Sequence, residues 1–355
     1  MPAVFVCRAG GSGLPIVLAA GLTRAASGNR LLLPLRCSAA RRFEQTSVDL
    51  TVAKKSSPRA LWHPKFWPAW CGVFVLYLLS FLPLGAKQHV GAWLGRLTFR
   101  VWGGRRKVAL RNLEVCFPHL APTERRALAE ENFVACLRGA LETLHAWWRD
   151  MKPGYEKSVV LGLEHLRAAQ AEGKGILLIG AHYSIFDFAL PLIAHYLKKP
   201  GYMYRPNDNP VIDGMIERGR RRHGITGAFT KRQTRQMLNF LRDGGEVWYA
   251  CDQDFGKYCD LFVPFCGVPA GVISAPSGIA RESGAKVICV SHLRLPDGRY
   301  EIAFSPVLEG FGVDKQADAE AWCGFHEAAV KRHPDQYLWL HKRFKTRPAG
   351  APPIY

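Results

Sequence analysis

The sequence predicts an α/β fold in which a mixed sheet is flanked by helices, and three observations lead to this prediction. Beyond Gly162, short aliphatic runs alternate with helix-like stretches. The run 175–180 is aliphatic between its glycines, which is typical of a strand buried on both faces. No internal repeat or low-complexity linker divides the second half of the chain. The strands expected there are Ile176 to Ile179, Val247 to Ala250, Val287 to Val290 and Tyr300 to Phe304.

The chain of 355 residues divides into four predicted regions. Residues 1–60 show little periodicity and are expected to form a poorly structured N-terminal extension. Residues 61–104 are predicted to hold a membrane-anchor helix and an interfacial helix. Residues 105–150 are predicted to form a helical segment that packs on an α/β domain, which is expected to cover residues 151–355.

The composition restricts the partners of this chain. A formal charge of +19 favours an acidic partner, such as a nucleic acid, an anionic membrane surface, an acidic protein or a phosphorylated substrate. Charge alone does not choose among these. The ten cysteines are scattered without a CxxC pair, and Cys251, Cys259 and Cys266 lack the paired spacing of a zinc site. Reduced packing cysteines in a protein that faces the cytosol are the better interpretation, and no metal is predicted.

The uncharged run 66–86 is the candidate membrane anchor. At about 1.5 Å per residue, it is long enough to cross a hydrocarbon core of about 30 Å, although a buried core helix is an open alternative. No acidic residue occurs between Asp49 and Glu114, whereas lysine and arginine are frequent there. Basic residues are commoner after the run than before it, so the positive-inside rule places the following domain in the cytoplasm.

An amphipathic helix is predicted directly after this run, over residues 87–102. Its helical spacing places several apolar side chains on one stripe, while arginines lie elsewhere on its surface. A helix of this kind can lie in the membrane interface. The apolar stripe consists of Val90, Leu94, Leu97 and Val101.

The strongest candidate for chemistry is the stretch GKGILLIGAHYSIFD, residues 173–187. Parallel strands end in ligand-binding crevices, so the strand is expected to deliver His182 to the mouth of a site. A histidine held by a carboxylate has a fixed tautomer and a stabilised imidazolium, as a general base requires. Five positions along a helix turn the chain by about 500°, so Asp187 reaches the ring only if His182 lies in the turn before a helix. A histidine that merely caps a helix is the alternative for this pair alone.

Two further groups follow other predicted strands. Arg205 and Asn209 belong to the turn-forming segment YRPNDNP, which would hold the arginine near the end of a neighbouring strand as an anion clamp. A structural salt bridge is the equal alternative for this arginine. Asp252, Gln253 and Asp254 follow the run that ends in Ala250 and are expected to point into the same crevice, to bind sugar hydroxyls or to hold Arg205. An ordinary solvated turn would look the same.

A dense basic group lies between these two segments. It could attract an acidic protein or lipid phosphates, although a solvated helix face is the more frequent meaning of such a run. Its members are Arg218, Arg220, Arg221, Arg222, Lys231, Arg232 and Arg235.

Several motifs in a fixed order resemble those of the lipid A biosynthesis acyltransferases, the late lauroyl and myristoyl transferases of Gram-negative bacteria. The resemblance covers roughly residues 61–348. The motifs are HPKFWPAW, RRKVALRNLEVCFP, GKGILLIGAHYSIFD, YRPNDNPVID, DQDFG, VPFCGVPAG and PDQYLWLHKRFKTRP.

The resemblance implies a fold similar to that of glycerol phosphate acyltransferases and a catalytic pair of His182 and Asp187. It associates Arg205 with substrate binding or catalysis. It further implies acyl carrier protein as an acidic donor, a lipid A precursor as acceptor, contact with membrane lipid, and no cofactor or nucleic acid. Departures from the family pattern at Cys251, Cys266 and the segment TKRQTR leave acyl length and acceptor position open.

The sequence therefore predicts an acyltransferase of the bacterial inner membrane, single-pass or monotopic, with its catalytic domain on the cytoplasmic face. An acyltransferase acting on another membrane glycolipid or lysophospholipid would keep every one of these residues. A basic, membrane-tethered binding protein without catalysis explains the charge and the anchor, but it leaves His182, Asp187 and the DQDFG segment without a role.

Overall fold

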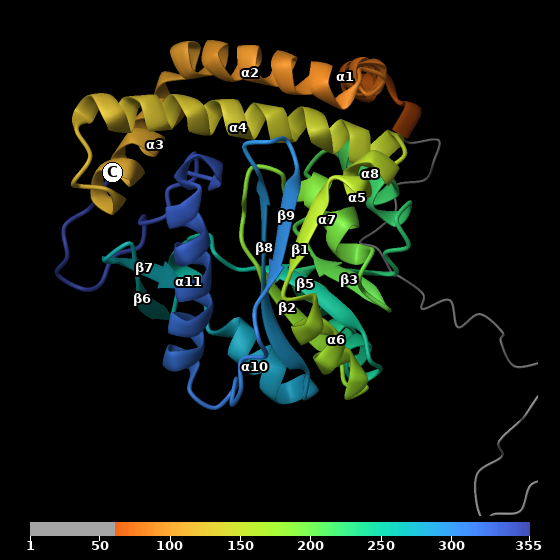
Figure 1. Ribbon diagram of the computed structural model, residues 1–355, viewed down its shortest axis with the longest axis vertical. Coiled ribbons are helices and arrows are strands. Elements are labelled where there is room, and N and C mark those ends of the chain that lie inside the picture. Colours follow the sequence, from red (N-terminus) through yellow and green to blue (C-terminus); the bar gives the residue numbers. More distant parts are fainter. Residues whose placement is uncertain (1–60) are drawn as a thin grey trace, which may run out of the picture. The chain divides into compact units, whose positions relative to one another are not determined.

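The computed structural model describes residues 61–355, and the prediction for residues 1–60 lies outside this part of the chain. Within the described part, the main sheet has seven strands in the order β1-β9-β8-β2-β5-β3-β4 (Figure 1). The strands are β1 (Ser158–Leu161), β2 (Ile176–Gly180), β3 (Pro200–Met203), β4 (Gly227–Phe229), β5 (Glu246–Ala250), β8 (Lys286–Arg294) and β9 (Tyr300–Phe304). All neighbours are parallel except β8 and β9. The predicted mixed α/β sheet and its four predicted strands are confirmed.

Strand β2 lies in the middle of this sheet, between β5 and β8. Its side chains alternate between the two faces, as the pleat of a strand requires. Ile176 and Leu178 pack on the face covered by α6 (Leu163–Ala171) and α7 (Phe186–Ala194). Leu177 and Ile179 pack on the opposite face. That face is covered by α9 (Thr234–Arg242), α10 (Ala275–Ser283) and α11 (Lys315–Arg332). Burial on both faces explains the continuous aliphatic run.

Beside the sheet, β6 (Leu261–Phe265) and β7 (Val268–Val272) form an antiparallel hairpin. Cys266 lies in its turn and has a φ of 53°, a left-handed conformation that is uncommon for a residue with a side chain. The cysteines of the described part are all free thiols.

The long helix α4 (Pro122–Trp148) runs above the sheet, with α2 (Leu84–Val101) lying along its outer side (Figure 1). Glycines allow this close approach. A Cβ at Gly91 would stand 2.7 Å from the Cα of Arg138, and one at Gly95 would meet the backbone of Val134. On its other side, α4 touches the turn after His182, because a Cβ at Gly139 would collide with the carbonyl group of Ser184. Helix α4 therefore connects α2 with the edge of the sheet at which β2 ends.

The sequence predicted a single helix over the uncharged run 66–86, and this prediction is wrong. The run divides at residues 80–83 into α1 (Trp67–Leu79) and the start of α2. In residues 61–355, no helix has both the length and the apolar character needed to cross a membrane. Pro83 precedes the first turn of α2, and its fixed φ of −56° suits this position. The predicted stripe of α2 does not face the core, since Leu97 and Val101 are exposed while Gly91, Gly95 and Phe99 are buried.

The remaining helices complete this part of the chain. Helix α3 (Gly103–Cys116) contacts α4, and α8 (Pro210–Arg221) follows β3. The shorter segments are α5 (Lys152–Glu156) and the 3-10 turns η2 (Pro64–Phe66), η3 (Lys231–Gln233), η4 (Gly256–Tyr258) and η5 (Pro334–Gln336).

Candidate active site

His182 lies in the turn that follows β2, two residues beyond Gly180. The turn is tightly packed, since a Cβ at Gly180 would stand 2.6 Å from Cε2 of Trp248 on β5. Helix α7 begins at Phe186, so the predicted order of strand, turn, histidine and helix is present. The imidazole is fixed from one side, because its ring stacks on Phe186 with 4.9 Å between the ring centroids and 7° between the planes.

The carboxylate that holds His182 belongs to Asp252, which follows β5. Oδ1 of Asp252 accepts a hydrogen bond from Nδ1 of His182 at 2.6 Å, and Oδ2 accepts one from its backbone N–H at 3.0 Å. Burial by itself raises the pKa of Asp252, but the charge of His182 and these hydrogen bonds outweigh it and hold the pKa well below its usual range. Asp252 is therefore an anion that fixes both the ring and the backbone of the histidine.

The second ring nitrogen of His182 is available to a ligand. Within the described residues, Nε2 has no hydrogen-bond partner, and the side chain is 23% exposed. With Nδ1 donating to Asp252, Nε2 of the neutral ring is the acceptor. This is the arrangement that a general base requires.

The sequence predicted that Asp187 holds the ring of His182, but its carboxylate binds another residue. Its Oδ1 accepts hydrogen bonds from Nε and Nη2 of Arg220 at 2.9 and 2.6 Å. This ion pair is largely buried, and the guanidinium also lies over the ring of Tyr202 at 4.7 Å. Five residues of chain place Asp187 in the first turn of α7, where it faces α8, whereas the end of β5 lies directly beside that of β2.

Arg205 follows β3, at the same edge of the sheet, but its side chain points into solvent. It is 85% exposed and lies 3.5 Å from Asp208, which is itself exposed. Of the two interpretations that the sequence left open for Arg205, this contact corresponds to a surface ion pair, which contributes little to stability. Asn209 caps α8, since its Oδ1 accepts a hydrogen bond from the N–H of Val211 at 3.0 Å. The cap explains why an asparagine precedes Pro210.

Asp254 was predicted to point into the crevice, but its carboxylate is bound within the protein. Its carboxylate accepts hydrogen bonds from the backbone N–H and the hydroxyl of Thr346 at 2.6 and 2.7 Å, and from the N–H of Gly256 at 2.8 Å. These bonds attach the C-terminal segment to the end of β5. Gln253, between the two aspartates, is half-buried.

A segment near the C-terminus completes the turn around His182, and the sequence assigned it no role beyond a family motif. The N–H of Leu338 donates to the carbonyl of His182 at 3.0 Å. The N–H of Ser184 donates to the carbonyl of Gln336 at 2.7 Å. Tyr183 and Tyr337 form an isolated antiparallel bridge. No local signal could have revealed this pairing, because about 150 residues separate the partners.

Comparison with known proteins shows the family of this chain. The family described as bacterial lipid A biosynthesis acyltransferase matches residues 54–346. A lipid A biosynthesis lauroyltransferase of Escherichia coli (strain K12) is 36% identical over 301 residues, which cover 83% of this chain and 97% of that protein. A palmitoleoyltransferase of the same organism is 31% identical over 307 residues, with 84% and 97% covered. A myristoyltransferase of that organism is 26% identical over 292 residues, with 81% and 90% covered.

The family match extends over the run 66–86, the sheet and the C-terminal segment, and it includes every residue of the site. The α/β fold, with a histidine at the end of a central strand, is thus that of an acyltransferase. The chain belongs to the bacterial lipid A biosynthesis acyltransferase family.

Proposed function

We propose that this protein transfers a fatty acyl chain from acyl carrier protein to a hydroxyl of a lipid A precursor, a step of lipopolysaccharide biosynthesis. The observation that carries the proposal is His182, whose Nδ1 is held by a buried carboxylate while Nε2 is free. The names of the related proteins support the acceptor. The formal charge of +19 supports an acidic donor.

In the proposed reaction, Nε2 of His182 removes the proton of the acceptor hydroxyl while its oxygen attacks the thioester carbonyl. The new C–O bond forms, the C–S bond breaks, and the proton passes from the ring to the departing thiolate. The buried anion of Asp252 stabilises the intermediate imidazolium. The first N–H groups of α7, which begins four residues after His182, are available to stabilise the oxyanion.

Asp187 has a positioning role in this proposal. Its ion pair with Arg220 joins the first turn of α7 to α8 and thereby orients the turn that carries His182. Arg205, exposed at the sheet edge, is proposed to contact an anionic group of a substrate. Asn209, Asp252 and Asp254 act through the protein, since each has hydrogen-bond partners within the chain. Only Gln253 of the DQD segment is left as a direct substrate contact.

The test of the reaction is the variant His182→Ala, assayed in membranes with acylated carrier protein, a lipid A precursor and competing lipid acceptors. Mass spectrometry of the products should show loss of acyl transfer, because no other group of the described site occupies the position of Nε2. His119→Ala is the matched control, since this histidine is exposed and contacts only the ring of Phe117 among the described residues. Near-normal transfer by His182→Ala would refute the assignment.

The donor is proposed to dock on the basic surface formed by α8 and the start of α9. Several arginines of this surface are already engaged, Arg220 by Asp187 and Arg221 by Glu217. The exposed side chains that the described contacts leave without an acidic partner are Arg218, Arg222, Lys231, Arg232 and Arg235. Such a cluster attracts an acidic protein by long-range electrostatics.

Charge reversal tests this docking surface. The double variant Arg232→Glu/Arg235→Glu should raise KM for the acylated carrier protein strongly and leave kcat nearly unchanged, because it alters association rather than chemistry. KM for the same acyl group on coenzyme A should change much less. Equal effects on both donors would show that these arginines do not recognise the carrier protein.

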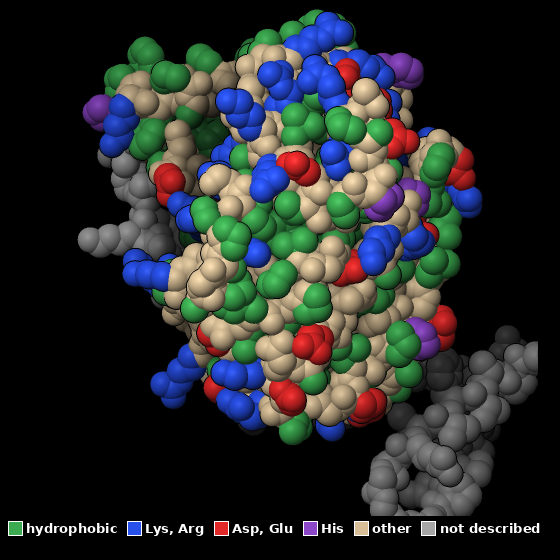
Figure 2. All heavy atoms as spheres, turned by 90° about the vertical axis from the view of Figure 1, so that its left-hand side faces the viewer, with side chains coloured by type: hydrophobic (Ala, Val, Ile, Leu, Met, Phe, Trp, Pro, Cys, Tyr) green, Lys and Arg blue, Asp and Glu red, His purple; other side chains and the backbone are tan. Residues whose placement is uncertain are grey.

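Membrane association is proposed to occur at the cytoplasmic face of the inner membrane, through α1, α2 and the residues that flank them. Large apolar side chains are exposed along these elements. They are Trp62, Trp67, Phe74, Val75, Leu78, Phe81, Trp93, Leu97, Val101 and Trp102. Figure 2 shows lysine and arginine side chains gathered at the end of the molecule where α2 and α4 lie. Apolar side chains beside basic ones are typical of a surface that binds anionic lipid.

A further inference from the structure

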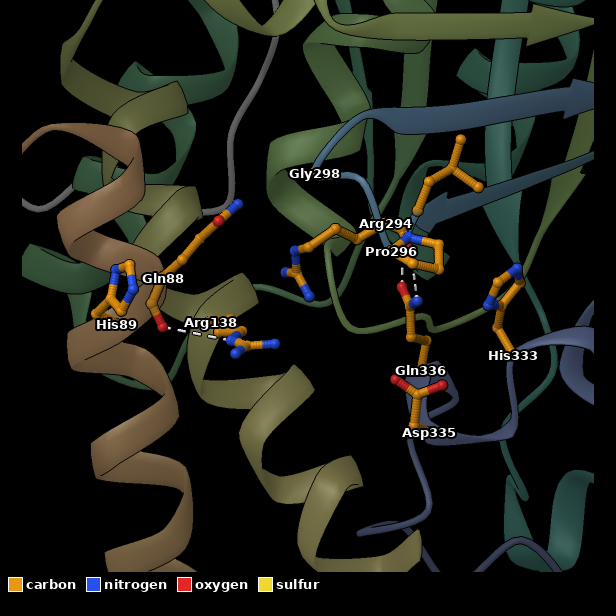
Figure 3. A pocket seen from close by; sticks show the side chains of 10 residues that line it. Gln88, His89, Arg138, Arg294, Pro296, Gly298, His333, Asp335 and Gln336 are labelled. Atoms are coloured by element: carbon orange, nitrogen blue, oxygen red, sulfur yellow. Dashed lines mark hydrogen bonds between the residues drawn. The ribbon is translucent and has the colours of Figure 1, made fainter.

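A polar cavity of about 400 Å³ lies apart from His182, between α2, α4 and two loops (Figure 3). Helix α2 contributes Gln88 and His89, and α4 contributes Arg138. The turn between β8 and β9 and the segment around η5 form the rest of the wall. Charged and polar side chains of these two segments are those of Arg294, His333, Asp335 and Gln336.

Arg138 is the cation of this cavity whose charge is not matched. Its Nε donates to the carbonyl of Gln88 at 3.3 Å, and the described residues include no carboxylate within ion-pair distance of it. Arg294, by contrast, is paired with the buried carboxylate of Glu142, whose Oε1 lies 3.0 Å from Nε. Figure 3 shows the guanidinium of Arg138 directed into the space between α4 and the opposite loop. An arginine in this position presents a donor fork for an anion.

Beside the paired Arg294, the opposite wall carries an acceptor. The carboxylate of Asp335 is half-buried and accepts no hydrogen bond from another described residue. His333 stands beside it. The side chain of Gln336 is occupied, since it exchanges two hydrogen bonds with the backbone of Arg294, at 2.6 and 2.7 Å. A group that carries an anion and also hydroxyl or amine donors fits this lining better than a bare anion does.

The cavity is connected to the catalytic turn. The backbone carbonyl of Gln336 accepts a hydrogen bond from Ser184, two residues after His182, and Leu338 binds the carbonyl of His182 itself. On its outer side, the cavity is bounded by α2, which exposes Trp93 and Leu97. A ligand held here would have its polar part inside the protein, against the segment that binds the catalytic turn, while its acyl chains pass along the apolar surface of α2.

We propose that this cavity binds the phosphate-bearing sugar of the lipid acceptor, with Arg138 holding the phosphate and Asp335 accepting hydrogen bonds from the sugar. The inference rests on the proposed function and deepens it, because it names the part of the acceptor that is recognised away from the reacting hydroxyl. A lipid A precursor is a phosphorylated amino-sugar lipid, which has both groups.

Direct binding tests the cavity independently of catalysis. Glucosamine 1-phosphate, glucosamine and inorganic phosphate are titrated into the detergent-solubilised full chain by calorimetry. Glucosamine 1-phosphate should bind more tightly than either of the other two. Arg138→Gln should weaken it by about tenfold to a hundredfold, the range expected for a hydrogen bond to a charged group. Arg125→Gln on the same helix is the matched control, since its only side-chain hydrogen bond among the described residues is a 3.5 Å bond to Pro118.

Kinetics then distinguish recognition from folding and from chemistry. For the phosphorylated acceptor, Arg138→Gln should raise KM by a similar factor while kcat and KM for the donor stay near the wild-type values. For the dephosphorylated acceptor, wild type and variant should be equal. Arg138→Lys should recover part of the affinity, because it restores the charge without the planar fork.

The possible outcomes separate the two proposals. If the wild type transfers no acyl group, the proposed function fails while the titrations still decide the cavity. Equal losses of activity on both acceptors, or an effect on donor KM, would overturn the assignment of the cavity to the acceptor phosphate. Equal affinity of wild type and Arg138→Gln for glucosamine 1-phosphate would also overturn it. Binding of inorganic phosphate as tightly as the sugar phosphate would reduce it to a general anion site and contradict the role of Asp335.

Discussion

At the scale of single residues, the site depends on which of two carboxylates meets His182. Asp187 is close in sequence and belongs to the motif, but its carboxylate is bound by Arg220. Asp252 is 70 residues away and binds the ring at 2.6 Å. The sequence identified both residues, because each follows a predicted strand, but it assigned the contact with His182 to Asp187 and a substrate contact to Asp252. Short-range spacing could not reveal that β5 pairs directly with β2 and brings its own carboxylate to the histidine.

The different partners of the two aspartates lead to a prediction for Asp252→Asn and Asp187→Asn. Asp252→Asn should lower kcat by about 10² to 10⁴, the usual contribution of a positioned base, because an amide no longer stabilises the imidazolium. Asp187→Asn should cause a smaller loss, which the further change Arg220→Gln does not increase, since the two residues act as one ion pair. Steady-state kinetics of the three variants measure both effects, and a larger loss for Asp187→Asn would reverse the roles of the two aspartates.

The same aspartate makes a prediction about pH and stability. The pKa of Asp252 is lower in the folded protein than the value of about 3.9 in an unfolded chain. Its anion therefore stabilises the fold above about pH 4, and this contribution is lost as the pH falls toward the folded pKa. Chemical denaturation should show Asp252→Asn to be less stable than wild type at neutral pH, with the difference narrowing below pH 4. A difference independent of pH would exclude the charge as its cause.

At the scale of elements, the contact between α2 and α4 depends on glycines. A Cβ at Gly95 would collide with the backbone of Val134, whereas nothing lies within 4 Å of a Cβ at Gly85 in the same helix. Gly95→Ala should cost about 1–3 kcal/mol of stability through overpacking. Gly85→Ala should instead be neutral or stabilising by up to about 1 kcal/mol, because alanine is the better helix former. Thermal unfolding of both variants gives the two signs.

Lys87 fixes the turn between α1 and α2. Its buried ammonium donates to the carbonyl of Ser80 at 2.8 Å and lies 3.2 Å from Nδ1 of His145 on α4. Burial and the neighbouring Arg149 lower the pKa of Lys87 to about 8, although Glu142 opposes the shift. The sequence predicted one continuous apolar helix over residues 66–86. The pattern alone could not show that Lys87, directly after this run, is buried and binds Ser80 and His145.

This lysine gives a second pH prediction, of the same sign but in a more alkaline window. Between about pH 8 and 10.5 the unfolded chain keeps a proton on Lys87 that the folded chain has lost, so stability should rise with pH through this window. Lys87→Met should remove this contribution. The measurement is the difference in unfolding free energy between wild type and variant at pH 7.5 and 9.5, since other titrating groups cancel in that difference. An unchanged difference would show that the pKa of Lys87 is not shifted.

At the scale of the whole molecule, the described chain exposes its large apolar side chains mainly along α1 and α2, while the sheet and its flanking helices bury theirs. Exposed apolar surface of this extent marks an interaction site. The helix pair presents this surface without a span that crosses the bilayer among the described residues. The proposed binding of lipid through this surface should respond to lipid charge and to salt, because basic side chains lie beside the apolar ones.

Vesicle sedimentation tests this surface. The double variant Trp93→Ser/Leu97→Ser should bind anionic vesicles more weakly than wild type, because both side chains are exposed and lose only apolar area on substitution. Val313→Ser is the control, since Val313 is 88% exposed and lies far along the chain, before α11. Binding should also weaken as salt is raised. Equal sedimentation of both variants would show that α2 does not contact lipid.

The sequence by itself determined the α/β sheet, its four central strands and the position of His182 in the turn after β2, because these depend on local pattern: aliphatic runs, glycines and helix starts. Tertiary structure alone decided the partner of His182, the exposure of Arg205, the structural role of Asp254 and the division of the apolar run into two helices. For His182, Asp254 and the apolar run, the deciding contacts join residues far apart in the chain. Which carboxylate reaches the base is set by the order of strands in the sheet, and no spacing along the sequence records that order.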